Sequence, residues 1–264
     1  MSANDDTRKS EIRRAFGRAA STYDNAASVQ RAAVARLFAF TRALPPAMPV
    51  RYTLDAGCGT GQALPGLAVR FPHAHRIALD FSAAMLAHVR TPGVLPVCAD
   101  IERLPFADAA IELYWSSLAL QWCDPAAALA EAARVLRPGG MAWIATLGPR
   151  TLYELRTAFA TVDEDSHVID FFPISHWLAA AGDAGLIVAA HAREPLHDLA
   201  ADLRELLGNI KAIGARSVGD GRRRRTLGRQ GWQLLQSAYE AFRLPGGMLP
   251  ATYDLILLAL RKPA

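Results

Sequence analysis

One turn decides the fold, and its sequence is Leu54-Asp55-Ala56-Gly57-Cys58-Gly59-Thr60-Gly61-Gln62. A short apolar run precedes this turn and a helical pattern follows it, which places it at a strand-to-helix connection. Glycine suits such a turn because the backbone bends sharply there and lets a ligand approach closely. The spacing is G-x-G-x-G, whereas dinucleotide-binding turns carry G-x-G-x-x-G.

Acidic residues accompany three successive predicted strands. Asp55 stands two residues before the first glycine, where a carboxylate would repel a pyrophosphate but could hold the ammonium group of a methionine moiety. Asp80 ends the next strand, 23 residues after Gly57, and fits a carboxylate that accepts both ribose hydroxyls. Asp100 follows the third strand, where it can accept a hydrogen bond from the adenine amino group while Ile101 packs on the ring. These features predict S-adenosylmethionine as the cofactor; the alternative is an ordinary turn with acids at strand ends.

Strands and helices alternate on either side of this turn, from Tyr52 to Thr146. The predicted strands are Tyr52–Asp55, Ile77–Asp80, Leu95–Cys98, Ile111–Ser116 and Met141–Thr146. The predicted helices are Gln62–Arg70, Ser82–Arg90 and Pro125–Leu136, the last followed by a turn at Arg137-Pro138-Gly139-Gly140. Repeated strand–helix units predict an α/β fold with a parallel, Rossmann-like sheet.

The two ends of the chain extend this pattern. The first 44 residues are predicted to be helical, and a proline-rich link follows them. Beyond Gly148 the expected elements are helices Thr151–Thr161 and Ser175–Ala184, a sixth strand Leu186–Ala192, a mostly helical insertion Leu199–Phe242 and a final strand Tyr253–Arg261. We therefore predict a seven-stranded methyltransferase sheet with six parallel strands and an antiparallel last one. Residues 1–48 would form an N-terminal helical cap and residues 49–264 the catalytic domain, whose helical lid at about 199–246 covers the ligand edge of the sheet.

Composition limits the setting of the protein. The chain has 264 residues, 52% of them hydrophobic, and no apolar run approaches the roughly 18 to 20 residues that cross a bilayer. Acidic residues and the lack of an apolar core in the N-terminal segment argue against a secretory signal. Cys58, Cys98 and Cys123 are odd in number and widely spaced, which suggests neither disulfides nor a zinc site. We expect a cytoplasmic protein without a membrane or metal partner.

The residues after the fourth predicted strand bear on the methyl acceptor. Enzymes that methylate exocyclic amines of nucleobases often carry Asn/Asp-Pro-Pro-Tyr/Phe at this point. This chain has instead Trp115-Ser116-Ser117-Leu118-Ala119-Leu120-Gln121-Trp122-Cys123. Nothing in that stretch cradles an sp² amine in the same way.

Several segments together resemble one family, the BioC malonyl-[acyl-carrier protein] O-methyltransferases of biotin synthesis. They are Ala15-Phe16-Gly17-Arg18-Ala19-Ala20-Ser21-Thr22-Tyr23-Asp24, Leu54–Gly61, Ser116–Cys123, Ala212-Ile213-Gly214-Ala215-Arg216 and Leu249-Pro250-Ala251-Thr252-Tyr253. The glycine turn is common to many methyltransferases, so the first segment, Gln121-Trp122 and Ile213-Gly214-Ala215 are the restrictive ones. The resemblance covers roughly residues 12 to 261. The chain departs from it at Ser117, where the family often has Asn, and in an unusually aliphatic final strand.

The resemblance implies methyl transfer to the free carboxylate of a malonyl thioester. A carboxylate with a pKa of about 4 is already ionised at neutral pH, so no general base or metal is required. We expect Tyr23 to help position this carboxylate and Gln121 and Trp122 to line the transfer pocket; core or interface packing is the alternative for the aromatic pair. The residues assigned to the cofactor are Arg18, Asp55, Gly57, Cys58, Gly59, Gly61, Asp80, Phe81, Met85, Asp100, Ile101 and Ser116. Arg18 is expected at the methionine end, and a solvated helix charge is its equal alternative.

The net charge of +4 is concentrated in the predicted insertion. Between Arg204 and Arg229 there are eight basic residues and two acidic ones, with four consecutive arginines at Arg222–Arg225. If the substrate is a malonyl-acyl-carrier protein, this run would dock the acidic carrier. A solvated surface run is the equal alternative. Nucleic acid fits less well, because no aromatic residues interleave the arginines.

Two further functions stay open at this stage. One is a methyltransferase of another small molecule, such as a quinone, built on the same cofactor domain. The other is a BioC-like assembly factor that keeps the fold without the chemistry. The intact glycine turn, Asp80 and Gln121-Trp122 favour an active enzyme.

Overall fold

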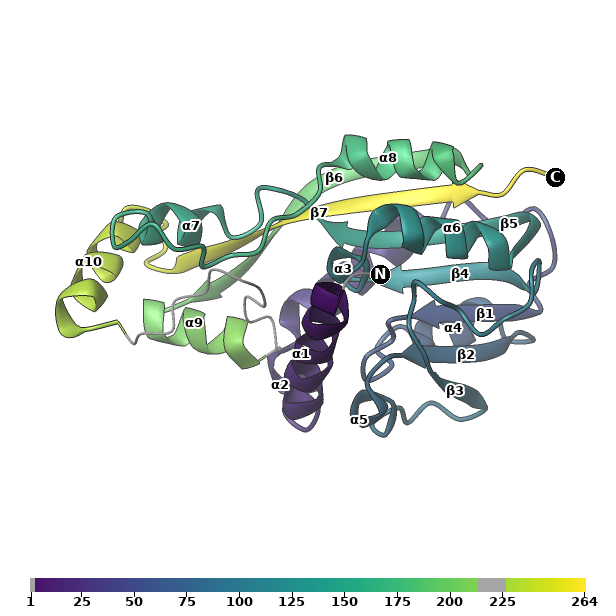
Figure 1. The fold of residues 1–264 in the computed structure, drawn as a ribbon, viewed down its shortest axis with the longest axis horizontal. Helices are drawn as coiled ribbons and strands as arrows, with labels where there is room; N and C mark the ends of the chain where they lie inside the picture. Colours follow the sequence, from purple (N-terminus) through teal and green to yellow (C-terminus); the bar gives the residue numbers. More distant parts are fainter. Residues whose placement is uncertain (1–2, 213–226) are drawn as a thin grey trace. The chain divides into compact units, whose positions relative to one another are not determined.

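The computed structural model describes residues 3–212 and 227–264, and Figure 1 shows their fold. The chain forms two compact units. The sheet unit comprises residues 30–148, 172–194 and 255–264, and the helical unit comprises residues 1–29, 149–171 and 195–254. The predicted division into a cap at 1–48 and a catalytic domain with a lid at about 199–246 stays a prediction.

A seven-stranded sheet of order β3-β2-β1-β4-β5-β7-β6 confirms the predicted fold class. Its strands are β1 (Tyr52–Ala56), β2 (His75–Asp80), β3 (Val94–Cys98), β4 (Ile111–Ser117), β5 (Leu136–Leu147), β6 (Ile187–Ala200) and β7 (Leu249–Arg261). β1 pairs in parallel with β2 and β4, β3 with β2, and β5 with β4, while β7 is antiparallel to β5. All carboxyl ends of β1 to β5 therefore meet at one edge of the sheet.

Helices cover the sheet and build the helical unit. They are α1 (Ala3–Ala19), α2 (Tyr23–Ala26), α3 (Ser28–Phe40), α4 (Leu64–Arg70), α5 (Ala83–Leu86), the 3-10 turn η1 (Leu120–Trp122), α6 (Pro125–Val135), α7 (Tyr153–Phe159), α8 (Ile174–Asp183), α9 (Leu203–Ala212) and α10 (Arg229–Glu240). In the described part of the chain, no helix combines the length and the apolar character that a membrane span requires.

The two faces of the central strands pack against different helices. Side chains alternate along β4, so that Tyr114 joins the core formed with α6 and α8, whereas its neighbour Trp115 lies on the opposite face. There the Phe38 ring of α3 packs at a tilt on Trp115, at 4.3 Å between ring centroids. Trp115 and Tyr114 are both fully buried, so β4 is covered on each side, as expected for a parallel sheet.

The structure corrects the predicted turn between α6 and the fifth strand. The strand begins at Leu136, not Met141, and the four residues Arg137–Gly140 form an irregularity opposite a single residue of β4. Gly139 has a φ of +78° there, and a Cβ on Gly140 would lie 2.9 Å from the carbonyl oxygen of Arg137. The Pro-Gly-Gly sequence therefore serves a bulge inside a pairing strand.

The last two strands are longer than the apolar pattern predicts. β6 continues to Ala200, past the expected end at Ala192, and β7 starts at Leu249, ahead of Tyr253. Helix α9 begins at Leu203, so the expected insertion is helical only in α9 and α10 within its described residues. In the helical unit α10 packs along α7.

Candidate functional site

The glycine turn leaves β1 and folds back beside β2. The N–H groups of Gly57 and Cys58 both donate to the carbonyl of Leu79, at 2.7 and 2.9 Å. Gly57, Gly59 and Gly61 have φ angles of +76°, +54° and +90°, a region in which side chains are strained. The G-x-G-x-G spacing is thus the spacing of left-handed positions in this turn.

Gly57 also has no room for a side chain. A Cβ placed on it would lie 2.2 Å from the Cβ of Ala119, which follows β4, and 3.2 Å from Cδ1 of Ile101, which follows β3. The ends of β1, β3 and β4 therefore converge on this glycine. Ile101 was predicted at this site, whereas Ala119 was not, because only the placement of β4 beside β1 brings it there.

Asp80, at the end of β2, is tied to the same turn. Its Oδ2 accepts from the N–H of Gly59 at 3.0 Å and its Oδ1 from the N–H of Ser82 at 2.8 Å. Burial raises the pKa of this carboxyl, and the two backbone hydrogen bonds oppose the rise. Each oxygen of an ionised carboxylate can accept a second hydrogen bond, so Asp80 is fixed in place and can still receive hydroxyl donors.

Asp55, the fourth residue of β1, is a buried acid with an unused oxygen. Only 2% of the residue is exposed, and Oδ2 has no hydrogen-bond partner among the residues that the structure describes. Burial, and after it the negative charge of Asp80, raise the pKa of Asp55 to about 8. A buried acceptor of this kind is costly unless a donor reaches it. A bound cation or ammonium group would supply that donor and favour the ionised form.

The carboxyl end of β4 contributes the next group of site residues. The Ser116 hydroxyl donates to the carbonyl of Ala56 at 2.8 Å and joins the ends of β4 and β1. Leu118 then adopts a left-handed conformation with a φ of +52°, and its carbonyl accepts from Nε2 of Gln121 at 2.7 Å. The Gln121 side chain is therefore held by backbone, while its Oε1 is buried and has no partner among the described residues. Trp122 follows it in η1 and is half-buried.

Two hydroxyls near this edge were not assigned from the sequence. The Oγ of Ser117, at the end of β4, and the Oγ1 of Thr146, near the end of β5, are buried without a hydrogen-bond partner among the described residues. Both fall at the carboxyl end of a strand, which is the one signal that the sequence carried. Ser117 ends β4, the strand next to β1 with Asp55, and Thr146 lies in β5, the strand next to β4.

The remaining predicted residues of the sheet unit surround the same turn. The buried Cys58 directs its thiol to the Gly59 carbonyl, and burial raises the pKa of that thiol. Phe81 follows Asp80, and Met85 is buried in α5. Asp100 accepts from the N–H of Glu102 at 3.0 Å in the turn after β3.

Three predicted features lie elsewhere in the chain. Arg18 and Tyr23 belong to the helical unit, where Arg18 is exposed and the Tyr23 ring meets Phe16 edge to face at 6.5 Å. Their predicted roles remain predictions. The arginine run Arg222–Arg225 and the segment Ile213–Arg216 lie outside the described residues.

Comparison with known proteins places this arrangement among methyltransferases. Residues 54–144 match the model of a methyltransferase domain. A malonyl-[acyl-carrier protein] O-methyltransferase of Dechloromonas aromatica is 48% identical over 96% of this chain and 95% of that protein. A protein of the same name from Laribacter hongkongensis is 39% identical over 98% of this chain and 91% of that protein. A putative methyltransferase structure from Bacillus halodurans has a TM-score of 0.61 at 18% identity, covering 88% of this chain and 99% of that one, and so shares the fold.

Proposed function

This chain belongs to the family of malonyl-[acyl-carrier protein] O-methyltransferases, and we propose that it methylates the free carboxylate of a malonyl thioester with S-adenosylmethionine. The product is the methyl ester that starts the pimeloyl chain of biotin. Within the molecule, the proposal depends on one observation above all. Asp55 presents an unpartnered, buried carboxylate oxygen beside a glycine turn at the carboxyl edge of the sheet.

The residues at this edge fit S-adenosylmethionine group by group. Asp55 would hold the ammonium of the methionine moiety, Asp80 the ribose hydroxyls and Asp100 the adenine amine. No pyrophosphate has to be accommodated, so the two buried acids beside the turn are an advantage. When bound, the cofactor supplies an electrophilic methyl group on a sulfonium sulfur. Ile101 meets the turn at Gly57 and would cover the adenine ring.

The acceptor side needs orientation more than acid–base chemistry. The malonyl carboxylate is ionised at neutral pH and attacks as it is, so the protein has to strip its water and align it. Gln121 is suited to this task because its amide is fixed on the Leu118 carbonyl and its Oε1 remains available. The roles of Tyr23 in positioning the carboxylate, of Arg18 at the methionine end and of Trp122 in lining the pocket form part of the proposal and rest on the sequence.

The carrier protein would dock on the basic run Arg222–Arg225, a proposal that rests on charge in the sequence. Reversing these four charges should raise the KM for malonyl-carrier protein far more than the KM for malonyl-coenzyme A. Equal effects on both substrates would reject docking there. A cytoplasmic setting, which the three free cysteines suit, completes the proposal.

Methyl transfer itself is the direct test. The purified protein, incubated with S-adenosylmethionine and malonyl-carrier protein, should form the malonyl methyl ester, and its gene should restore growth of a strain lacking the malonyl methyltransferase on biotin-free medium. Asp55→Asn serves as the inactive reference. Calorimetric binding of S-adenosylhomocysteine without transfer to any malonyl thioester would favour another acceptor or an assembly factor. Absence of any binding would reject the cofactor as well.

A further inference from the structure

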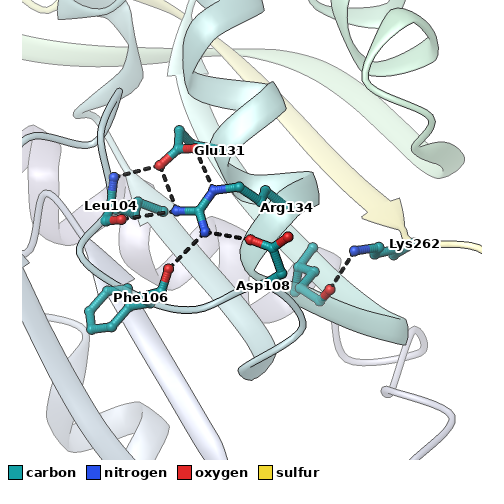
Figure 2. A network of polar contacts seen from close by, with 7 residues as sticks. Leu104, Phe106, Asp108, Glu131, Arg134 and Lys262 are labelled. Carbon is teal, nitrogen blue, oxygen red and sulfur yellow. Dashed lines mark hydrogen bonds and ion pairs between the residues drawn. The ribbon is translucent and has the colours of Figure 1, made fainter.

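The loop between β3 and β4, residues 99–110, carries Asp100 and Ile101 and is held by several hydrogen bonds from α6. The Arg134 guanidinium donates to the carbonyls of Leu104 and Phe106, at 2.9 and 2.7 Å. It also donates to the carboxylates of Glu131 and Asp108. Figure 2 shows this planar fork reaching from α6 across the loop.

All donors of this guanidinium are used. Nε and Nη2 bind Glu131 at 2.6 and 2.9 Å, and Nη2 also binds the carbonyl of Leu104. Nη1 binds the carbonyl of Phe106 and the carboxylate of Asp108. A guanidinium has five N–H groups in a fixed plane, and five bonds are made. These bonds lower the pKa of Glu131 and raise that of Arg134, so the pair stays charged. Lysine, with three donors around one nitrogen, cannot reproduce the pattern.

Glu131 also bonds the loop directly, at Leu104. Its Oε2 accepts from the N–H of Leu104 at 2.6 Å. Glu102, between Asp100 and Leu104, accepts at 2.8 Å from the N–H of Asp124, the residue that caps α6. The turn at Asp100 therefore continues into a segment that is clamped to α6 along its length.

We propose that Glu131 and Arg134 position Asp100 and thereby determine the selectivity of the site for an adenine base over a 6-oxopurine. This inference rests on the proposed function and deepens it. A carboxylate fixed opposite the 6-amino group of adenine accepts its hydrogen bond, whereas the same carboxylate faces an oxygen in hypoxanthine and is repelled. A carboxylate on a loose loop can shift to the N1–H of hypoxanthine and recover a bond. Selectivity therefore depends on how firmly the loop is held.

The chain contains its own control for this clamp. Glu240 and Arg243 in the helical unit repeat the spacing, with two bonds between guanidinium and carboxylate and two more to the carbonyls of Ala201 and Gly247. This second pair belongs to the helical unit, whereas the loop 99–110 belongs to the sheet unit. A lysine at either arginine removes a similar fork from the protein.

The experiment measures Kd by calorimetry for S-adenosylhomocysteine and S-inosylhomocysteine on the full chain, with Arg134→Lys, Glu131→Gln, Arg243→Lys and Glu240→Gln. We expect the wild type to prefer the adenine ligand at least about 100-fold. In Arg134→Lys this preference should contract about tenfold, because the adenine ligand loses a fixed acceptor while the loosened carboxylate can bond the N1–H of the inosine ligand. Glu131→Gln should contract it less, and the two control variants should retain it.

A structural role alone would give another result. If Arg134→Lys and Glu131→Gln weaken both ligands by the same factor, the preference is unchanged and the inference is wrong. Glu131→Gln keeps the side-chain volume and one acceptor, so it carries the test if Arg134→Lys does not fold. A wild type that binds neither ligand would overturn the proposed cofactor, which is a separate outcome.

Discussion

Two buried carboxylic acids, one in each unit, differ in how their oxygens are used. Glu154 of α7 is fully buried, and both of its oxygens accept from Thr252 of β7, one from the hydroxyl and one from the N–H at 3.2 Å. Asp55 of β1 is almost as deeply buried, yet its Oδ2 has no partner within the described residues. A buried carboxylate with hydrogen-bond partners contributes to the stability of the fold. One with an unpartnered oxygen lowers that stability until a ligand supplies a donor.

The hydrogen bonds of Glu154 continue through Thr252 to a third residue. The hydroxyl of Thr252 donates to Glu154, so it accepts from Nδ1 of His197 on β6, 3.2 Å away. This chain of bonds joins α7 to the parts of β7 and β6 that belong to the helical unit. Removing the Glu154 carboxylate should therefore lower the stability of the fold, whereas removing the Asp55 carboxylate should weaken cofactor binding.

The largest expected effect is on stability, in Glu154→Ala. Two buried donors of Thr252 lose their acceptor and a cavity is left, which together should lower the free energy of unfolding by about 3 kcal/mol. Urea denaturation followed by circular dichroism measures the loss. The affinity of the remaining folded protein for S-adenosylhomocysteine should stay within about twofold of wild type. Glu154→Gln, which keeps one acceptor, should lose about 1 kcal/mol.

Asp55→Asn should do the opposite: it should weaken ligand affinity and leave the stability of the fold intact. The change is isosteric and removes the charge that we assign to the ammonium group, so the Kd for S-adenosylhomocysteine should rise about 100-fold. The free energy of unfolding, measured in urea near pH 8, should stay the same or rise slightly, because a buried carboxylate no longer has to ionise in the folded state. Glu154→Gln is the matched control. An affinity within threefold of wild type would remove Asp55 from the cofactor site.

The contrast between these acids explains how far the sequence alone could lead. Asp55 and the three glycines lie within one local segment, and Asp80 follows at the end of the next strand, at the offset of about 20 residues that such sites have. That is why spacing predicts them. Glu154 looks like any helix-surface glutamate, since its partner Thr252 is 98 residues away in the sequence. Only the pairing of distant segments reveals that it is buried.

The same reasoning applies to the parts of the fold that were predicted incorrectly. Arg137–Gly140 has the composition of a turn, but β4 beside it supplies pairing that turns the segment into a bulge of β5. β6 lies at the edge of the sheet, with one face exposed and the other half-buried or buried. Beyond Ala192 the sequence Arg193-Glu194-Pro195 interrupts the alternation of apolar and polar residues, so the sequence pattern does not indicate a strand of 14 residues. Neighbouring strands decided both outcomes.

The pH dependence of cofactor binding should follow Asp55. Its pKa is raised from 3.8 to about 8 by burial and by Asp80, so this group's contribution to folding is full below pH 3.8 and is lost as the pH rises through about 8. Binding an ammonium group requires the ionised form, so affinity should move the other way. The Kd for S-adenosylhomocysteine should rise about tenfold from pH 7 to pH 6, with nearly one proton released per ligand at pH 7.

Calorimetry in buffers of different ionisation enthalpy measures this proton release. Asp55→Asn should abolish both the release and the steep pH dependence, while Glu154→Gln should retain them. A flat affinity between pH 6 and pH 8 in the wild type would mean that Asp55 is already ionised in the free protein. The unpartnered oxygen would then have another explanation.

The smallest expected effect is a shift in the midpoint of that pH profile in Asp80→Asn. Burial is the larger cause of the raised pKa of Asp55 and the charge of Asp80 the smaller one. Removing the charge should therefore move the midpoint to lower pH but leave it well above the ordinary range of an aspartate. Affinity for the ribose will fall as well, yet the midpoint does not depend on the absolute affinity. Asp170→Asn, at an acid whose side chain is 95% exposed in the helical unit, is the control and should leave the midpoint in place. An unmoved midpoint in Asp80→Asn would mean that burial alone sets the titration of Asp55.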